Sequence, residues 1–136
     1  MTPETWYAAS ARPFESLPSL EGRREARVAV VGGGYAGVCL ALGLAERGMR
    51  EVVLLEREGI GHGASGRNGG FVFAGYSLGE DALLRQLGAE RARALYGATT
   101  RAVDLIRQRI RQYAIACDAV DAGVIWANWF RDGSIV

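Results

Sequence analysis

Short apolar runs and glycine-rich turns alternate in the first half of the chain, and their order predicts a strand, a helix and a second strand. Residues 27–31 form an apolar run that ends at three glycines, which suits a buried parallel strand covered on both faces. Apolar side chains then recur at helical spacing over 35–47, and Gly48 predicts the end of that helix. A second apolar run, over 52–55, ends in Glu56. Together these elements span about 30 residues, the size of a βαβ unit.

The flanking segments are less regular. Residues 1–25 contain three prolines and no clean periodicity, which predicts an extended arm. Residues 57–75 are rich in Gly, Ser and Asn and predict no regular element, whereas 89–113 predict a helix with arginines on its solvated side. Residues 123–130 predict a strand, followed by a hairpin turn at Asp132-Gly133. The apolar helix face comprises Leu95, Ala98, Ala102, Leu105, Ile106, Ile110 and Tyr113. The large side chains expected to pin the arm to a surface are Trp6, Tyr7 and Phe14.

Composition narrows the possible functions. The 136 residues are 49% hydrophobic, enough for one domain with a packed core, and the formal net charge of +1 provides no basic field for nucleic acid or acidic membranes. All sixteen basic residues are arginines, so the segment has neither a P-loop lysine nor a Schiff-base lysine. Cys39 and Cys117 are too few for a disulfide framework or a metal cluster, and a reducing cytoplasm is the simplest compartment. We find no secretory signal pattern and no apolar run long enough to span a bilayer.

The turn after the first predicted strand matches the dinucleotide-binding pattern G-x-G-x-x-G. Gly32 permits the tight turn, Gly34 lets a pyrophosphate approach the backbone, and Gly37 lets the helix pack closely on the strand. The N–H groups and positive dipole end of the helix would hold the anion. Glu56 follows at about the expected ~20-residue distance and could accept both ribose hydroxyls. A tight turn without a ligand is the alternative, but it does not explain an acid at the end of an apolar strand. The residues of this turn predicted to contact the cofactor are Gly32, Gly34, Tyr35, Ala36 and Gly37, with Tyr35 packing beneath the turn.

A second glycine-rich patch, over 61–70, holds small residues with one arginine and one asparagine. Such a loop can lie flat along an extended cofactor, and Arg67 could offer its fork of donors to phosphate or flavin oxygens. A flexible surface linker is the alternative.

Arg57 could indicate a 2′-phosphate, but Glu56 would repel that group, which favours a solvated arginine or one covering the adenine. His62 could be a general base or a covalent flavin anchor, although a loop histidine near the cofactor is favoured. The predicted cofactor contacts beyond the first turn are Glu56, Arg57, Ala64, Ser65, Arg67, Asn68 and Gly69.

These motifs together resemble the FAD-dependent D-amino-acid-oxidase-like (DAO) family. The resemblance rests on the glycine turn, the helix with Gly48 after it, Glu56 and the run Gly63-Ala64-Ser65-Gly66-Arg67-Asn68-Gly69-Gly70, and 6–10 are similar to the leader of the gamma-glutamylputrescine oxidase branch. It implies FAD, bound covalently or not, and oxidation of the C–N bond of an amine or amino acid. Hydride would pass to flavin, the imine would hydrolyse, and oxygen would usually reoxidise the flavin. It also implies that the turn glycines hold the pyrophosphate, that Glu56 holds the adenosine ribose, and that the flavin half lies near Ser65, Arg67 and Asn68.

We therefore expect an α/β fold: a partial Rossmann-type FAD-binding βαβ domain with the start of a substrate domain. The expected parts are an arm over 1–26, an FAD-binding region over 27–116 and a truncated substrate domain over 117–136. Family members run to several hundred residues, so the resemblance implies an N-terminal fragment, inactive alone, with catalytic residues beyond Val136. The expected partner is a small amine or amino acid, without a metal. An NAD(P)-linked dehydrogenase domain and a non-catalytic nucleotide-binding fragment remain the alternatives.

Overall fold

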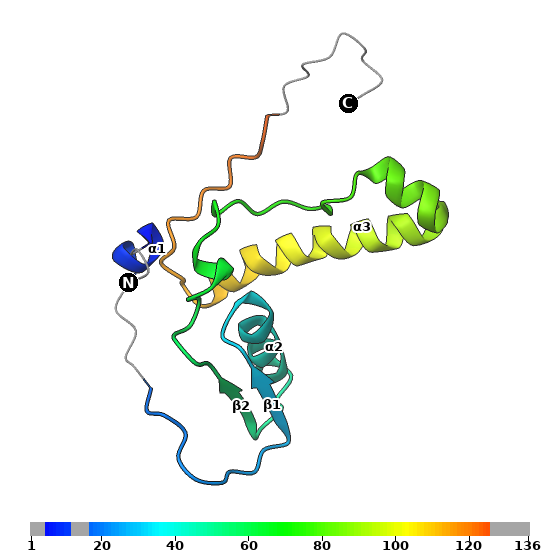
Figure 1. The fold of residues 1–136 in the computed structure, drawn as a ribbon. Coiled ribbons are helices and arrows are strands. Elements are labelled where there is room, and N and C mark those ends of the chain that lie inside the picture. Colours follow the sequence, from blue (N-terminus) through cyan, green and yellow to red (C-terminus); the bar gives the residue numbers. More distant parts are fainter. Residues whose placement is uncertain (1–4, 12–16, 126–136) are drawn as a thin grey trace. The chain divides into compact units, whose positions relative to one another are not determined.

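The computed structural model describes residues 5–11 and 17–125 (Figure 1). It divides the chain into two compact units, Met1–Val72 and Phe73–Val136. The elements are α1 (Trp6–Ser10), β1 (Val28–Val31), α2 (Tyr35–Glu46), β2 (Val52–Leu55), the 3-10 turn η1 (Ala64–Gly66) and α3 (Glu80–Gln112). The first five lie in the first unit and α3 lies in the second. The boundaries expected at 26/27 and 116/117 concern cofactor- and substrate-binding parts and stay predictions.

The first unit contains the expected strand–helix–strand unit, with bounds within one residue of those predicted. β1 and β2 pair in parallel, in register from Val28 opposite Val52 to Val31 opposite Leu55, and α2 packs on both strands. In β1 only Val30 is buried, and Val31 is 84% exposed. The prediction that this strand is covered on both faces is therefore wrong for the described chain. One face carries α2, and nothing in the described part of this unit buries the other.

Gly48 ends α2 as predicted. It adopts φ +73, a left-handed conformation that glycine reaches without steric cost. Its N–H donates to Ala45 O at 2.9 Å, and the Met49 N–H donates to Leu44 O at 3.0 Å. This pair of bonds is the Schellman arrangement, which satisfies carbonyls that the end of a helix leaves without partners. The chain is thereby turned sharply into β2.

The arm is not wholly extended, because α1 forms within it. Thr5 caps this five-residue helix by accepting the Ala8 N–H at 3.1 Å, and Ser10 Oγ donates to Trp6 O at 2.8 Å. The prolines that suggested an extended chain flank this helix in sequence and do not interrupt it. Of the three side chains expected to pin the arm, Tyr7 lies against Gly70, Trp6 is 80% exposed, and Phe14 lies outside the described residues.

The long helix α3 begins nine residues earlier than the predicted start at 89. Gly88 interrupts it with φ 74 and ψ 162, so two helical segments meet at a bend, and only the second was predicted. Glu80 and Asp81 favour the start of the first segment through the helix dipole. The segment before α3 lies along it, with the Gly75 N–H donating to Thr99 Oγ1 at 2.8 Å and Tyr76 Oη donating to Leu95 O at 3.3 Å.

Burial along α3 differs from the expected pattern. Leu95 and Leu105 of the predicted apolar face are each 40% exposed. The buried residues of the helix are Leu83, Ala92 and Arg109, and Arg109 is only 9% exposed. The expectation that arginines occupy only the solvated side is therefore wrong at Arg109. An arginine can pack its aliphatic stem against other groups, so its charge alone does not place it in solvent.

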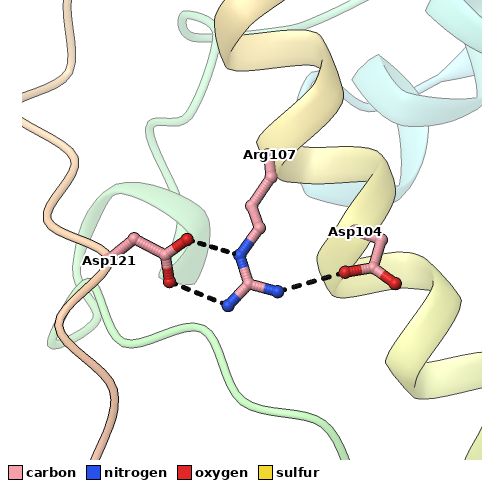
Figure 2. A network of polar contacts seen from close by, with 3 residues as sticks. All are labelled: Asp104, Arg107 and Asp121. Carbon is pink, nitrogen blue, oxygen red and sulfur yellow. Dashed lines mark hydrogen bonds and ion pairs between the residues drawn. The ribbon is translucent and has the colours of Figure 1, made fainter.

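The chain after α3 folds back onto it through Arg107 (Figure 2). Arg107 Nε and Nη2 donate to the two carboxylate oxygens of Asp121, each at 2.8 Å, and Nη1 donates to Asp104 at 3.1 Å. The intervening loop turns through positive φ at Ala114 and Asp118. A bidentate pair fixes orientation as well as distance, so Asp121 holds its segment in one direction relative to α3.

The strand expected over 123–130 is not seen in its first part, since 123–125 have no strand structure. The remainder of that prediction, with Trp126, Trp129 and the Asp132-Gly133 turn, lies outside the described residues. Over 5–11 and 17–125, no helix combines the length and the apolar character needed to cross a bilayer.

The Arg107–Asp121 contact predicts a local pH dependence. Hydrogen bonds from Arg107 hold the pKa of Asp121 below its ordinary value. The contact therefore contributes fully above the unfolded pKa of about 3.9 and is lost as the pH falls through the lower folded value. We expect the NMR chemical shift of Arg107 Hε, which donates to Asp121, to stay constant from pH 7 to about pH 5 and to move toward that of a solvated arginine under stronger acid. Asp121→Asn should move that chemical shift at neutral pH, whereas Asp104→Asn, which leaves the bidentate pair, should move it much less. Equal Arg107 Hε shifts in Asp121→Asn and the wild type would contradict this account.

Candidate functional site

The glycine turn joins β1 to α2, and a Cβ on Gly33, Gly34 or Gly37 would meet another atom within 3 Å, whereas a Cβ on Gly32 would meet none within 4 Å. The Gly32 N–H donates to Leu55 O at 2.8 Å, and Gly32 then leaves the strand with φ +102. A Cβ on Gly37 would overlap the carbonyl oxygen of Gly32, so only glycine lets the helix start this close to the strand. Gly34 is the N-cap of α2 and provides no side-chain cap. The first N–H groups of a helix have no partner within it, so here other groups must meet them.

Ser65 meets one of these N–H groups. Its Oγ accepts from the Tyr35 N–H at 2.9 Å, and it would lie 2.9 Å from a Cβ on Gly34. The Gly61 N–H also donates to Gly33 O at 2.9 Å. The segment 61–65 is therefore hydrogen-bonded to the glycine turn at both of its ends. The two glycine-rich segments, 30 residues apart in sequence, thus form one surface at the start of α2.

Glu56 turns its carboxylate toward the glycine turn. Oε2 accepts the Gly33 N–H at 2.5 Å, and Oε1 accepts the Glu58 N–H at 2.9 Å. The hydrogen bond from Glu58, followed by that from Gly33, lowers the pKa of Glu56 below its ordinary value, so the carboxylate is ionised at neutral pH. Arg57 is directed to a different partner: its side chain is 90% exposed and forms an ion pair with Glu58 at 3.1 Å.

Asn68 organises the second glycine-rich patch. Its Nδ2 donates to Ser65 O at 2.9 Å and to Tyr35 Oη at 3.1 Å, and its Oδ1 accepts the Gly70 N–H at 2.8 Å. Tyr35 is 63% exposed, so the expectation that it packs beneath the turn is wrong. Its hydroxyl reaches across to Asn68 because the second patch lies over the helix start. Arg67 uses Nε to donate to the His62 carbonyl at 3.0 Å, which braces the loop from within.

The remaining predicted contacts occupy the same region without polar side chains of their own. Ala36 lies in the first turn of α2, Ala64 begins η1, and Gly69 lies beside the ring of Phe71. The first unit thus contains every predicted cofactor-contacting residue. Sequence reasoning missed Gly33 as the donor to Glu56, although three successive glycines after an apolar strand were a visible signal. It also missed Ile60, whose Cδ1 would lie 2.6 Å from a Cβ on Gly33.

The donor set suits a nucleotide diphosphate. A bare helix start with a neighbouring hydroxyl can bind an anion, and an ionised carboxylate one strand away can accept hydroxyl hydrogens from a sugar. A side chain on Gly34 would project toward Ser65 Oγ. Over the described residues, no cluster of three or more His, Cys, Asp or Glu side chains could hold a metal ion.

Comparison with known proteins identifies the family of the chain. The sequence model of the family described as "FAD dependent oxidoreductase" (DAO) matches residues 27–134. The chain belongs to this family. It is 42% identical over 123 residues to the gamma-glutamylputrescine oxidoreductase of Escherichia coli strain K12, covering 90% of this chain and 29% of that protein. No solved structure matches the chain.

Two further relatives carry less specific names. The probable oxidoreductase OrdL of Haemophilus influenzae is 37% identical over 114 residues, which cover 84% of this chain and 26% of the relative. The protein of the same name from Rhizobium meliloti is 35% identical over 111 residues, covering 82% and 26%. The chain therefore spans between a quarter and a third of the length of these relatives.

The close approach at Gly37 predicts that its replacement is more damaging than that of Gly34. A Gly37→Ala Cβ meets main chain that cannot move without displacing the strand end, and we expect a loss of roughly 1–3 kcal/mol in the free energy of unfolding. Gly34→Ala meets only the Ser65 hydroxyl, which can rotate away, so its loss should be smaller. Thermal unfolding of both variants in the same background measures the difference. Equal midpoints for Gly37→Ala and the wild type would contradict the packing described here.

Proposed function

We propose that this chain forms the FAD-binding part of an oxidoreductase that oxidises the C–N bond of an amine or amino acid. The observation that carries the proposal is the joint anchoring of both glycine-rich segments at one helix start. Ser65 holds the Tyr35 N–H, and Glu56 holds the Gly33 N–H. A plain turn between a strand and a helix needs neither contact. Membership of the FAD-dependent family supports the choice of FAD over NAD(P).

Different residues of the site would bind different parts of the cofactor. The backbone at Gly32, Gly34 and Gly37 would hold the pyrophosphate against the start of α2, with Ser65 as an added hydroxyl. Glu56 would accept the hydroxyls of the adenosine ribose from its place at the end of β2. Asn68 and Arg67 would shape the loop beside the flavin half through their bonds to Ser65 O and His62 O. Bound FAD would supply the two-electron chemistry by accepting hydride from the substrate carbon.

For the substrate, we propose a small amine, with γ-glutamyl conjugates of polyamines as the first class to test. This rests on the 42% identity to a protein named gamma-glutamylputrescine oxidoreductase. The residues that select and activate the amine would lie outside the described part of the chain, so the activity belongs to the longer protein. Cys39 and Cys117 are free and exposed, which supports a reducing compartment such as the cytoplasm.

Two measurements on the full-length protein test this proposal. The purified protein should carry the absorbance bands of an oxidised flavin near stoichiometric occupancy. In the absence of air, at least one of γ-glutamylputrescine, glycine, sarcosine and a D-amino acid should reduce the flavin and bleach its absorbance bands. Oxygen should then restore the bands, with formation of peroxide. Protein that binds NAD(P)H but no flavin would overturn the choice of cofactor. Flavin that no amine reduces would overturn the choice of reaction.

Glu56 offers a sharper test of the cofactor geometry. Glu56→Gln keeps the shape but removes the negative charge that accepts hydrogen bonds, and we expect FAD affinity to fall by about tenfold or more. Glu58→Gln is the matched control, because it is the same substitution two residues away, on a side chain that pairs with Arg57 and is not a predicted cofactor contact, and it should change the affinity little. Titration of apoprotein with FAD, followed by the quenching of flavin fluorescence, gives both values. A loss in Glu58→Gln that equals the loss in Glu56→Gln would contradict the assigned roles.

A further inference from the structure

The short helix α1 places one side chain directly on the second glycine-rich patch. The Tyr7 ring ends at Gly70: a Cβ built on Gly70 would lie 2.5 Å from Tyr7 Oη and 3.5 Å from Tyr7 Cζ. Both residues belong to the first unit. Tyr7 is 39% exposed, whereas its neighbour Trp6 is 80% exposed. The helix therefore presents Tyr7, and not Trp6, to the loop.

Gly70 is constrained in two independent ways at this contact. Its φ of +71 disfavours any residue with a Cβ, and the Tyr7 hydroxyl occupies the space that a Cβ would enter. Its N–H is held by Asn68 Oδ1 at 2.8 Å. Asn68 in turn donates to Tyr35 Oη and Ser65 O. A continuous set of contacts thus runs from α1 through Gly70 and Asn68 to the start of α2.

We propose that Tyr7 is a positioning residue that holds the second glycine-rich patch in shape for the flavin half of the cofactor. The inference rests on the proposed function. Five glycines, at 61, 63, 66, 69 and 70, give the patch large conformational freedom, which ordering must overcome. The Tyr7 hydroxyl, held against Gly70, removes part of that freedom before the cofactor arrives. Tyr7 does not touch reacting atoms in this role; it lowers the ordering cost of binding.

The test compares three variants of the full-length protein: Tyr7→Ala, Tyr7→Phe and Trp6→Ala. Hydrogen exchange of peptides that cover 61–72 reports the order of the patch without cofactor, and FAD titration reports the affinity. Tyr7→Ala should speed exchange in this segment several-fold and raise the Kd for FAD by about fivefold to tenfold. Tyr7→Phe keeps the ring but removes Oη, the atom nearest to Gly70, so both effects should lie between those of Tyr7→Ala and the wild type. Trp6→Ala removes a larger aromatic group from the same helix and should change neither.

A mutant cycle keeps the proposal testable if single variants lose stability for other reasons. Gly70→Ala suffers both from its φ and from the clash with Tyr7, and only the clash disappears in the Tyr7→Ala background. The increase in Kd caused by Gly70→Ala should therefore be smaller in that background than in the wild type. Additive effects would overturn the contact.

Further outcomes distinguish the positioning role of Tyr7 from the proposed function of the chain. Unchanged exchange over 61–72 in Tyr7→Ala would overturn the positioning role, and so would faster exchange with an unchanged Kd. A full-length wild type that binds no FAD would overturn the proposed function. In that case the exchange data would still decide whether Tyr7 orders the patch.

Discussion

The bond between the Glu56 carboxylate and the Gly33 N–H is the constraint on which the candidate site depends. In a parallel pair, β1 and β2 end at the same edge, so a residue just beyond β2 can reach the turn that leaves β1. Glu56 uses this position to hold the turn with one oxygen and its own loop with the other. The carboxylate is thereby ionised and fixed in direction before any ligand arrives. Such preorganisation lowers the cost of binding, because neither the charge nor its position has to change.

The Ser65 hydroxyl raises the question of how an anion would reach the same helix start. Ser65 Oγ accepts the Tyr35 N–H, so it takes one of the donors that a phosphate would use. A hydroxyl also carries a hydrogen that it can donate, and in this position that hydrogen can point toward an approaching oxygen. The serine can therefore remain in place and add a donor to the remaining N–H groups of the helix start. Without a ligand, the bond of Ser65 to Tyr35 and the bonds from Asn68 hold the second glycine-rich patch at the start of α2.

The sequence predicted the parts of the fold that local chemistry determines. The bounds of β1, α2 and β2 followed from apolar periodicity and glycine punctuation, and Gly48 ended the helix through a conformation that few other residues adopt. The sequence-based prediction was wrong for features that local sequence patterns do not determine. The prolines of the arm indicated an extended chain, so α1 was not predicted. The first segment of α3 was not predicted either, because the chain leaves helical geometry for one residue at Gly88. No local pattern specifies which arginine of α3 is buried, or that the exposed Tyr35 is bonded to Asn68, 33 residues later in the sequence.

The small amount of buried surface has a consequence for how the cofactor would act on the fold. In the part of the chain that the structure describes, the sheet has two strands, Val31 is 84% exposed and Leu40 on α2 is 51% exposed. Two strands and one helix bury little apolar surface, and such assemblies gain stability only by packing against further elements or ligands. The site itself consists mainly of backbone groups and short polar side chains on loops, whose order costs conformational entropy. A cofactor that bridges both loops therefore stabilises the folded state by mass action, with a free energy that grows with its concentration relative to Kd. If FAD is that cofactor, as we propose, folding of this segment and binding of FAD would be coupled, and residues that order the loops would affect both.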